Sequence, residues 1–230
     1  RAARWVLTRC DGLFTHAEAL AERLARDYPG LPRAAHPLPA TAAGPLLDRA
    51  AARQSLGLPA GGRVAVFAGL IRPYKGVDLL LDAFASLPAE SDWRLVVAGE
   101  AWGGLGRQLQ RRAAGPGLAE KVRLDLRWQS EEELQKLLSA ADLVVLPYRD
   151  GSQSAMAPLV LAAGVPVLTT RVGGLAEVVE DGVNGRLVAP GSAELLAEAL
   201  AALDHERLAA LAAGARQTSS RLTWDGYAAA

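Results

Sequence analysis

Several residue types that build reactive centres are scarce in this sequence. The 230 residues include a single cysteine, Cys10, and three histidines, His16, His36 and His205, that lie far apart along the chain. One thiol cannot close an internal disulfide, and zinc and iron–sulfur sites need clustered thiolates. The sequence therefore predicts no metal site of this kind, offers no Ser-His-Asp arrangement, and indicates a reducing, cytoplasmic setting.

Net charge is also lacking. Lys and Arg number 25 and Asp and Glu number 25, so the formal net charge is 25 − 25 = 0. This balance argues against a broad nucleic-acid or anionic-membrane surface. The longest uncharged stretch, residues 151–170, contains serines, glycines and prolines, so it is not a transmembrane segment. Half the residues are hydrophobic and 22% are charged, a composition typical of a folded globular protein.

From residue 63 onward, short β-branched runs alternate with amphipathic helical patterns. The predicted strands are residues 63–68, 93–98, 121–124, 142–146, 166–169 and 185–188. The predicted helices between them are residues 77–87, 105–114, 131–140, 155–163, 174–180 and 193–203. This alternation predicts the α/β class, with a doubly wound, Rossmann-like parallel sheet covered by helices on both faces.

Both ends of the chain indicate a piece of a longer protein. Residues 1–40 carry one strand–helix unit, with a strand at 12–15, a helix at 17–27 and an extended piece at 33–36. A lone unit of this size cannot bury its own apolar face, so we interpret it as the end of a preceding domain. A Pro- and Gly-bearing stretch with a helix around 46–55 leads into the main domain, residues 41–218. Residues 219–230 begin another helix after a break at Ser219 and Ser220.

Residues 69–76 are the first candidate for binding chemistry. They read Gly-Leu-Ile-Arg-Pro-Tyr-Lys-Gly and join a predicted buried strand to a helix. Ligands bind at the carboxyl ends of strands in open α/β sheets, so Arg72 and Lys75 are suited to phosphate oxygens. Gly69 and Gly76 allow close approach of the backbone. The alternative is an ordinary loop with solvated cations.

Residues 147–156 follow another apolar strand and open a helix. Ser154 is the predicted N-cap, with Pro158 in the first turn. Free amides and the helix dipole favour an anion there. Because residues 151–170 contain no carboxylate, nothing in that stretch would repel a diphosphate. The alternative is a capped core helix with no ligand.

A Gly-Gly turn opens a third candidate helix. The backbone amides of Gly173 and Gly174 are suited to an anion or to sugar hydroxyls. Glu177, in the first turn of this helix, is a further expected substrate contact; the alternative is that the helix dipole alone accounts for an acid there. Dinucleotide and P-loop sites are disfavoured, because the glycines of residues 99–106 lack the G-x-G-x-x-G spacing and no Walker motif is present.

The order of these segments resembles the donor-binding half of GT-B glycosyltransferases, most nearly the retaining enzymes of family 4. The resemblance spans about residues 60–203 and rests on the joint pattern of residues 69–84, 95–100, 140–148, 164–167 and 172–188. In such enzymes the N-terminal domain binds the acceptor, and its last unit leads into the donor domain through a segment ending like Ala35-His36-Pro37. A C-terminal helix beginning like Leu222-Thr223-Trp224 crosses back.

The resemblance implies roles for particular positions. Lys75 matches the phosphate-binding lysine of the family, and Gly69 matches the glycine that ends the first strand. The family arginine usually follows that glycine directly, where this sequence has Leu70; Arg72, two residues later, is the substitute or points elsewhere. Trp128 lies where the family contacts the nucleotide base, with stacking and packing both open as its role.

Two family glutamates, eight residues apart, are missing. Counting back from Gly164 places them at Gly151 and Leu159, and a leucine cannot accept hydrogen bonds from a ribose diol. A subgroup of the family has a loop that reads Gln-Ser-Gly here, so polar contacts are expected from the loop before the helix instead. The expected donor contacts in this loop are Tyr148, Ser152, Gln153, Ser154 and Ala155.

The resemblance thus implies a bacterial, metal-independent, retaining glycosyltransferase with no cofactor. The donor would be a UDP-, GDP- or ADP-linked sugar, and the glycan, lipid or small-molecule acceptor would bind through the missing N-terminal domain. No nucleic acid and no transmembrane segment are expected, and the enzyme would be cytoplasmic, with peripheral association at the inner face of the membrane open. This piece alone should bind donor but transfer little. A non-catalytic nucleotide-sugar-binding module is the alternative, and a sugar-nucleotide epimerase is disfavoured because no catalytic acids can be placed.

Overall fold

The computed structural model describes residues 2–7, 9–39, 44–219, 222 and 224–228. Its centre is a six-stranded sheet in the order β5-β4-β3-β6-β7-β8, in which every neighbouring pair is parallel. The chain winds outward from β3 to β5, returns to β6 beside β3, and winds outward again. This is the doubly wound order, and the predicted fold class is confirmed.

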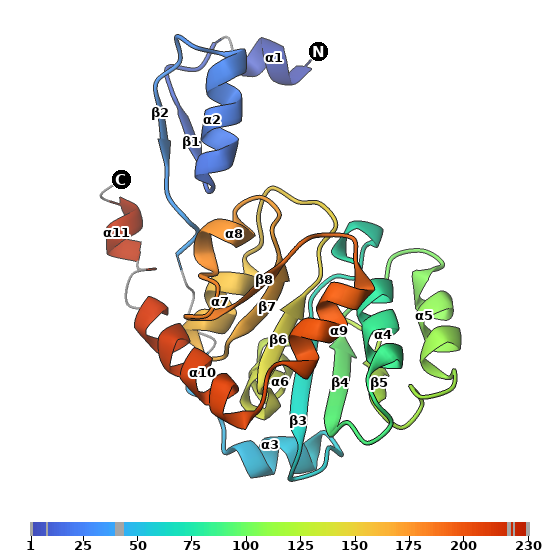
Figure 1. Cartoon of the computed structure of the whole chain (residues 1–230). Coiled ribbons are helices and arrows are strands. Elements are labelled where there is room, and N and C mark those ends of the chain that lie inside the picture. The colour runs from blue at the N-terminus through green and yellow to red at the C-terminus, as the bar shows by residue number, and fades with distance from the viewer. Residues whose placement is uncertain (1, 8, 40–43, 220–221, 223, 229–230) are drawn as a thin grey trace.

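The strands of the sheet are β3 (Arg63–Ala68), β4 (Trp93–Ala98), β5 (Val122–Asp125), β6 (Leu143–Leu146), β7 (Val167–Thr170) and β8 (Gly185–Val188). The helices are α3 (Arg49–Ser55), α4 (Val77–Ser86), α5 (Leu105–Ala113), α6 (Glu131–Ala140), α7 (Met156–Ala162), α8 (Leu175–Val178), α9 (Ala193–Ala201) and α10 (His205–Ser219). Helices α4, α5 and α9 pack on one face of the sheet; α6 and α7 lie on the other, with α3 against α6 and α10 against α7 (Figure 1).

The burial of each strand follows its place in the sheet. The four residues of β6 and the four of β7 are all buried, whereas the edge strand β5 has no buried residue. Central parallel strands are covered by helices on both faces, and this explains their continuous apolar runs. The continuous apolar runs that predict buried strands are therefore clearest in strands next to the site described below.

Three differences from the predicted boundaries are explained by specific hydrogen bonds. Strand β6 begins one residue late because the Asp142 carboxylate instead accepts the Val64 N–H (2.7 Å). Strand β5 is likewise shifted by one residue, because the Lys121 N–H closes a turn onto the Leu118 carbonyl (2.9 Å). The helix predicted at 174–180 is only the single turn α8, since the Asn184 side chain binds the backbone that follows it.

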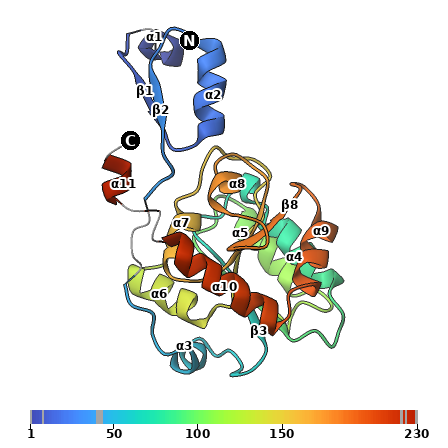
Figure 2. The same ribbon diagram turned by 60° about the vertical axis from the view of Figure 1, so that its left-hand side comes forward.

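The two ends of the chain form a separate group above the sheet (Figures 1 and 2). The N-terminal unit comprises α1 (Ala2–Leu7), β1 (Leu13–Thr15), α2 (Glu18–Asp27) and β2 (Arg33–Ala35), with β1 and β2 parallel. The sequence did not predict α1. Helix α11 (Trp224–Ala228) lies beside this unit, where the Tyr227 ring stacks on His16 at 5.7 Å between centroids. The predicted boundary at residues 40 and 41 lies outside the described residues. Of the predicted break at Ser219 and Ser220, Ser219 is the last residue of α10 and Ser220 lies outside the described residues.

Candidate functional site

Two loops meet at the centre of the sheet, where the direction of winding reverses between β3 and β6. The β3–α4 loop contains the 3₁₀ turn η1 (Pro73–Lys75), and Gly76 follows it with φ = 67°. A β-carbon on Gly76 would lie 2.1 Å from the Pro147 carbonyl oxygen of the β6–α7 loop, so only glycine permits this approach. The switch point, where ligands bind in open α/β sheets, is thus formed by the two segments that the sequence singled out.

Lys75 points back over the end of β3. A β-carbon on Gly69 would lie 3.7 Å from both the Lys75 Nζ atom and the Met156 Cε atom, and the amine is 5.3 Å from the centre of the Tyr148 ring. Lys75 has no carboxylate partner among the residues that the structure describes. Burial, with a smaller contribution from the positive charge of Arg72, lowers the pKa of its amine. A half-buried cation with no counter-ion is suited to an anionic ligand.

Arg72 is held by a tryptophan from the neighbouring loop. Its guanidinium carbon lies 4.0 Å from the centre of the Trp102 ring, a cation–π contact. The two loops are joined by the Ile71 N–H, which donates to the Glu100 carbonyl (2.8 Å), and by the Trp102 N–H, which donates to the Ile71 carbonyl (3.1 Å). Arg72 thus lies close enough to Lys75 to affect its titration, while Leu70 is 46% exposed.

The β6–α7 loop places its polar side chains around a buried tyrosine. The Tyr148 hydroxyl lies 3.2 Å from Ser154 Oγ, and burial raises the pKa of that phenol to about 12. The N-cap of α7 is Ala155 rather than the predicted Ser154, but Ser154 Oγ still accepts the Met156 N–H (3.3 Å). Pro158 lies in the first turn of α7, as predicted.

The β7–α8 loop packs directly on the β6–α7 loop. A β-carbon on Gly173 would lie 2.2 Å from the Gly151 carbonyl oxygen, so the two backbones touch. The Gly174 N–H donates to the Ser152 carbonyl (2.9 Å), and it is therefore occupied within the protein. Of the two glycines proposed as amide donors to a ligand, only Gly173 has an N–H without a partner in the described part of the chain.

Glu177 and Gln153 connect these loops to the N-terminal unit. The two Glu177 carboxylate oxygens accept the Glu18 N–H (2.8 Å) and the Ala19 N–H (2.9 Å) at the start of α2. The Gln153 amide donates to the His16 carbonyl (3.2 Å). Helix α2 has no side-chain cap of its own, because Ala17 is at its N-cap position. Glu177, expected to contact substrate, serves here as the cap of α2.

Replacing Glu177 with alanine is therefore expected to lower the free energy of unfolding by about 1 kcal/mol, the usual value of an N-cap. Amide hydrogen exchange at Glu18 and Ala19 should accelerate at the same time. Glu180→Ala is the matched control, since it removes an exposed carboxylate three residues away. Unchanged exchange at both amides in Glu177→Ala would show that the contact does not persist in solution.

The remaining predicted positions lie around the same edge of the sheet. Trp128 follows β5 and is 66% exposed, so its ring is open to a ligand and does not pack in the core. Gly151 is in the β6–α7 loop, and Leu159 lies on α7, partly buried against the hydrophobic core. No group of three or more His, Cys, Asp and Glu side chains that could hold a metal ion occurs in the part of the chain that the structure describes.

Sequence reasoning missed three side chains of the site. Trp102 lies in a glycine-rich loop after a predicted strand, and this position could have marked it as a candidate site residue. Asp78 and Arg149 form a two-pronged ion pair, with both N–O distances 2.7 Å, between α4 and the β6–α7 loop. They are 71 residues apart, and one sequence carries no signal for that pairing. No helix among the described residues has the length and apolar character needed to cross a membrane.

Comparison with curated proteins shows which proteins are similar to this chain in sequence. The D-inositol 3-phosphate glycosyltransferase of Thermobispora bispora is 41% identical over 191 residues, which cover 79% of this chain and 44% of that protein. The protein of the same name from Saccharomonospora viridis is 35% identical, over 95% of this chain and 54% of its own length. The chain thus spans about half the length of the curated relatives it matches.

Solved structures show the fold. Sucrose-phosphate synthase from Thermosynechococcus elongatus matches 99% of this chain and 58% of its own, with a TM-score of 0.85 and 24% identity. Anabaena HepE in complex with UDP matches 96% of this chain and 62% of its own, with a TM-score of 0.81 and 23% identity. A family model described as glycosyl transferases group 1 matches residues 48–218. The chain belongs to the glycosyl transferases group 1 family.

Proposed function

We propose that this chain provides the donor-binding half of a glycosyltransferase that moves a sugar from a nucleoside diphosphate to an acceptor hydroxyl. The observation that carries the proposal is the unpaired amine of Lys75 at the switch point, with the Arg72 guanidinium nearby. Neither cation has a carboxylate partner among the residues that the structure describes, and two such cations suit a diphosphate better than a single phosphate or a neutral sugar. The family membership of the chain agrees with this assignment.

The chemistry follows from where charge develops. The bond between the anomeric carbon and the donor phosphate oxygen breaks, and the nucleoside diphosphate leaves with the bonding electrons. A bond to the acceptor oxygen forms, and the proton of the acceptor hydroxyl passes to an oxygen of the departing diphosphate. Lys75 and Arg72 stabilise the negative charge of the departing diphosphate, which is greater in the transition state than in the bound donor. The proposed retention of configuration, like independence from a metal cofactor, rests on the family resemblance.

The relatives suggest which substrates to test first. UDP is bound in one solved HepE structure and UDP-glucose in another, so a UDP-linked sugar is the first donor candidate. The curated relatives are named for D-inositol 3-phosphate, and this makes a polyol phosphate the first acceptor candidate. Trp128 is the proposed platform for the base, because exposed indole rings stack well on planar heterocycles.

A second candidate is a non-catalytic module that binds nucleotide-sugars. It is favoured by Leu159, which packs against the hydrophobic core where the resembling enzymes have a glutamate for the ribose. Donor hydrolysis or transfer by a chain that includes an acceptor domain distinguishes the two candidates. Release of UDP from UDP-glucose would support the enzyme, and binding without any release would support the module.

The proposal is tested by calorimetry of this chain with UDP, GDP and ADP in EDTA as a function of pH. Because the pKa of Lys75 lies below its ordinary value of 10.5, the amine loses its proton earlier than a solvated lysine. Affinity for the preferred diphosphate should therefore be highest near neutral pH and fall before pH reaches 10.5. Lys75→Arg retains its charge in this range, so its affinity should stay level. No binding of any of the three nucleotides would contradict the proposal.

A further inference from the structure

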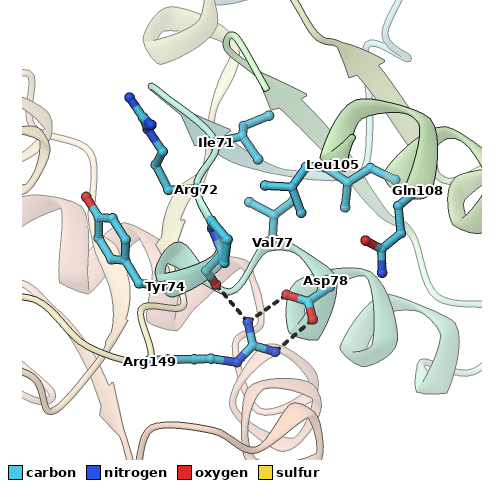
Figure 3. A pocket seen from close by; sticks show the side chains of 10 residues that line it. Ile71, Arg72, Tyr74, Val77, Asp78, Leu105, Gln108 and Arg149 are labelled. Atoms are coloured by element: carbon cyan, nitrogen blue, oxygen red, sulfur yellow. Dashed lines mark hydrogen bonds and ion pairs between the residues drawn. The ribbon is translucent and has the colours of Figure 1, made fainter. Parts of the chain in front are cut away.

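Arg149 is a third cation near the proposed diphosphate site, but its polar atoms are directed to the protein. Its Nη1 and Nη2 atoms donate to the two Asp78 carboxylate oxygens at 2.7 Å each, and Nη1 also donates to the Pro73 carbonyl (3.1 Å). Its backbone N–H donates to the Tyr74 carbonyl (2.7 Å). Figure 3 shows Arg72 directed away from this ion pair. Arg149 is thus hydrogen-bonded to the segment 73–78, which contains Lys75.

That segment has few bonds of its own. The turn η1 is only three residues long, and within it the Gly76 N–H reaches the Pro73 carbonyl at 3.3 Å. Asp78 lies in the first turn of α4, just beyond the turn. Arg149 therefore binds the chain on both sides of Lys75 from the loop that follows β6, the strand paired with β3. A pocket of about 530 Å³ lies beside the pair, so packing supports the loop on one side less than a filled core would.

We propose that Arg149 and Asp78 are positioning residues for Lys75: their ion pair fixes the β3–α4 loop, and Arg149 is not itself a ligand of the diphosphate. The diphosphate ligand in this inference comes from the proposed function, whereas the contacts of the ion pair come from the structure alone. The Asp78 carboxylate neutralises Arg149, and the guanidinium in turn lowers the pKa of Asp78. In the described part of the chain, Arg149 has a carboxylate partner in Asp78, whereas Lys75 has none.

The two possible roles of Arg149 predict opposite results for Asp78→Asn. If charge alone mattered, removing a carboxylate beside a cationic site would free Arg149 and tighten the binding of a diphosphate. If the pair positions Lys75, the same change releases the loop and weakens binding. The substitution is nearly isosteric, and both side chains are about one-third exposed, so the protein is expected to remain folded.

Calorimetry with UDP is the first measurement. Asp78→Asn and Arg149→Met are each expected to weaken UDP binding about tenfold, and the double variant should be no weaker than either, because one unit is broken in all three. Arg149→Lys should also weaken binding, since an ammonium cannot form the fork, although it would still serve as a phosphate ligand. Arg186→Met is the matched control, because its ion pair with Asp181 is equally exposed but lies at β8. Unchanged or tighter binding by Asp78→Asn would overturn the proposal.

A second measurement needs no nucleotide. The sequence has three lysines, Lys75, Lys121 and Lys136, so ¹³C-dimethylation gives three lysine signals besides that of the α-amino group, and NMR can follow the titration of each. Loss of the pair should expose the Lys75 amine and raise its pKa toward the ordinary value, even in Asp78→Asn, where removal of a negative charge would by itself lower it. An unchanged or lower Lys75 pKa in that variant would refute positioning. If the unmodified chain binds no nucleotide, the proposed function fails, while this titration still decides the role of the pair.

Discussion

Replacing Lys75 with alanine is expected to weaken UDP binding about 10- to 100-fold, the range of a charge-assisted contact in a partly buried site. The amine lies over Gly69 and near the Tyr148 ring, and no carboxylate among the described residues pairs with it. Burial lowers its pKa, so the protein holds this charge at some energetic cost until an anion arrives. A residue of this kind contributes more to ligand binding than to the stability of the fold.

The stability of the variant separates these two contributions. Removing an unpaired, half-buried cation should leave the thermal midpoint unchanged or raise it, whereas affinity should drop. Lys136→Ala is the control for loss of one positive charge, because Lys136 lies on α6 and has no ion pair among the described residues. Equal UDP affinity in Lys75→Ala and Lys136→Ala would place the diphosphate elsewhere.

The fold was predictable because its central strands carry continuous apolar runs. Strands β3, β4 and β8 have the predicted bounds, β6 begins one residue later than predicted, and β5 and β7 are each shifted by one residue toward the C-terminus. The late start of β6 comes from a contact between segments distant in sequence, the Asp142 carboxylate and the Val64 amide, and the shift of β5 comes from a local turn. Periodicity reports which residues are buried, but not which backbone amide a buried carboxylate binds.

The candidate site was predictable as a set of loops but not as a set of contacts. Strand ends meet at one edge of a parallel sheet, so the loops of Lys75, Tyr148 and Gly173 had to gather there. The role of Glu177 could not be read from its place in a first turn, since its partners lie 158 and 159 residues away in α2. Long-range polar pairs depend on how whole units dock, and that information is absent from local patterns.

Arg53→Met is expected to lower the free energy of unfolding by about 3–5 kcal/mol, the range seen when one partner of a buried ion pair is removed. Arg53 is 1% exposed, at the end of the sheet opposite the site. Its Nε atom donates to the Ala140 carbonyl (3.2 Å), and Nη1 donates to the carbonyls of Ala60 (2.9 Å) and Gly62 (3.1 Å). Its Nη2 atom pairs with Asp142 at 2.6 Å. Methionine fills similar space but leaves these acceptors without donors.

Arg49→Met provides the control, because Arg49 pairs with the same Asp142 carboxylate but its side chain is 51% exposed. Its loss should change the unfolding free energy by less than about 1 kcal/mol, as for other exposed pairs. Urea denaturation of the two variants measures both values on one scale. The difference between the two losses gives the contribution of the buried Arg53 guanidinium to the unfolding free energy. This guanidinium joins α3 to the start of strands β3 and β6, which lead into the two loops of the site. Equal losses in the two variants would mean that water replaces Arg53 at its carbonyl partners, and that the lower end of the sheet is more open than its burial indicates.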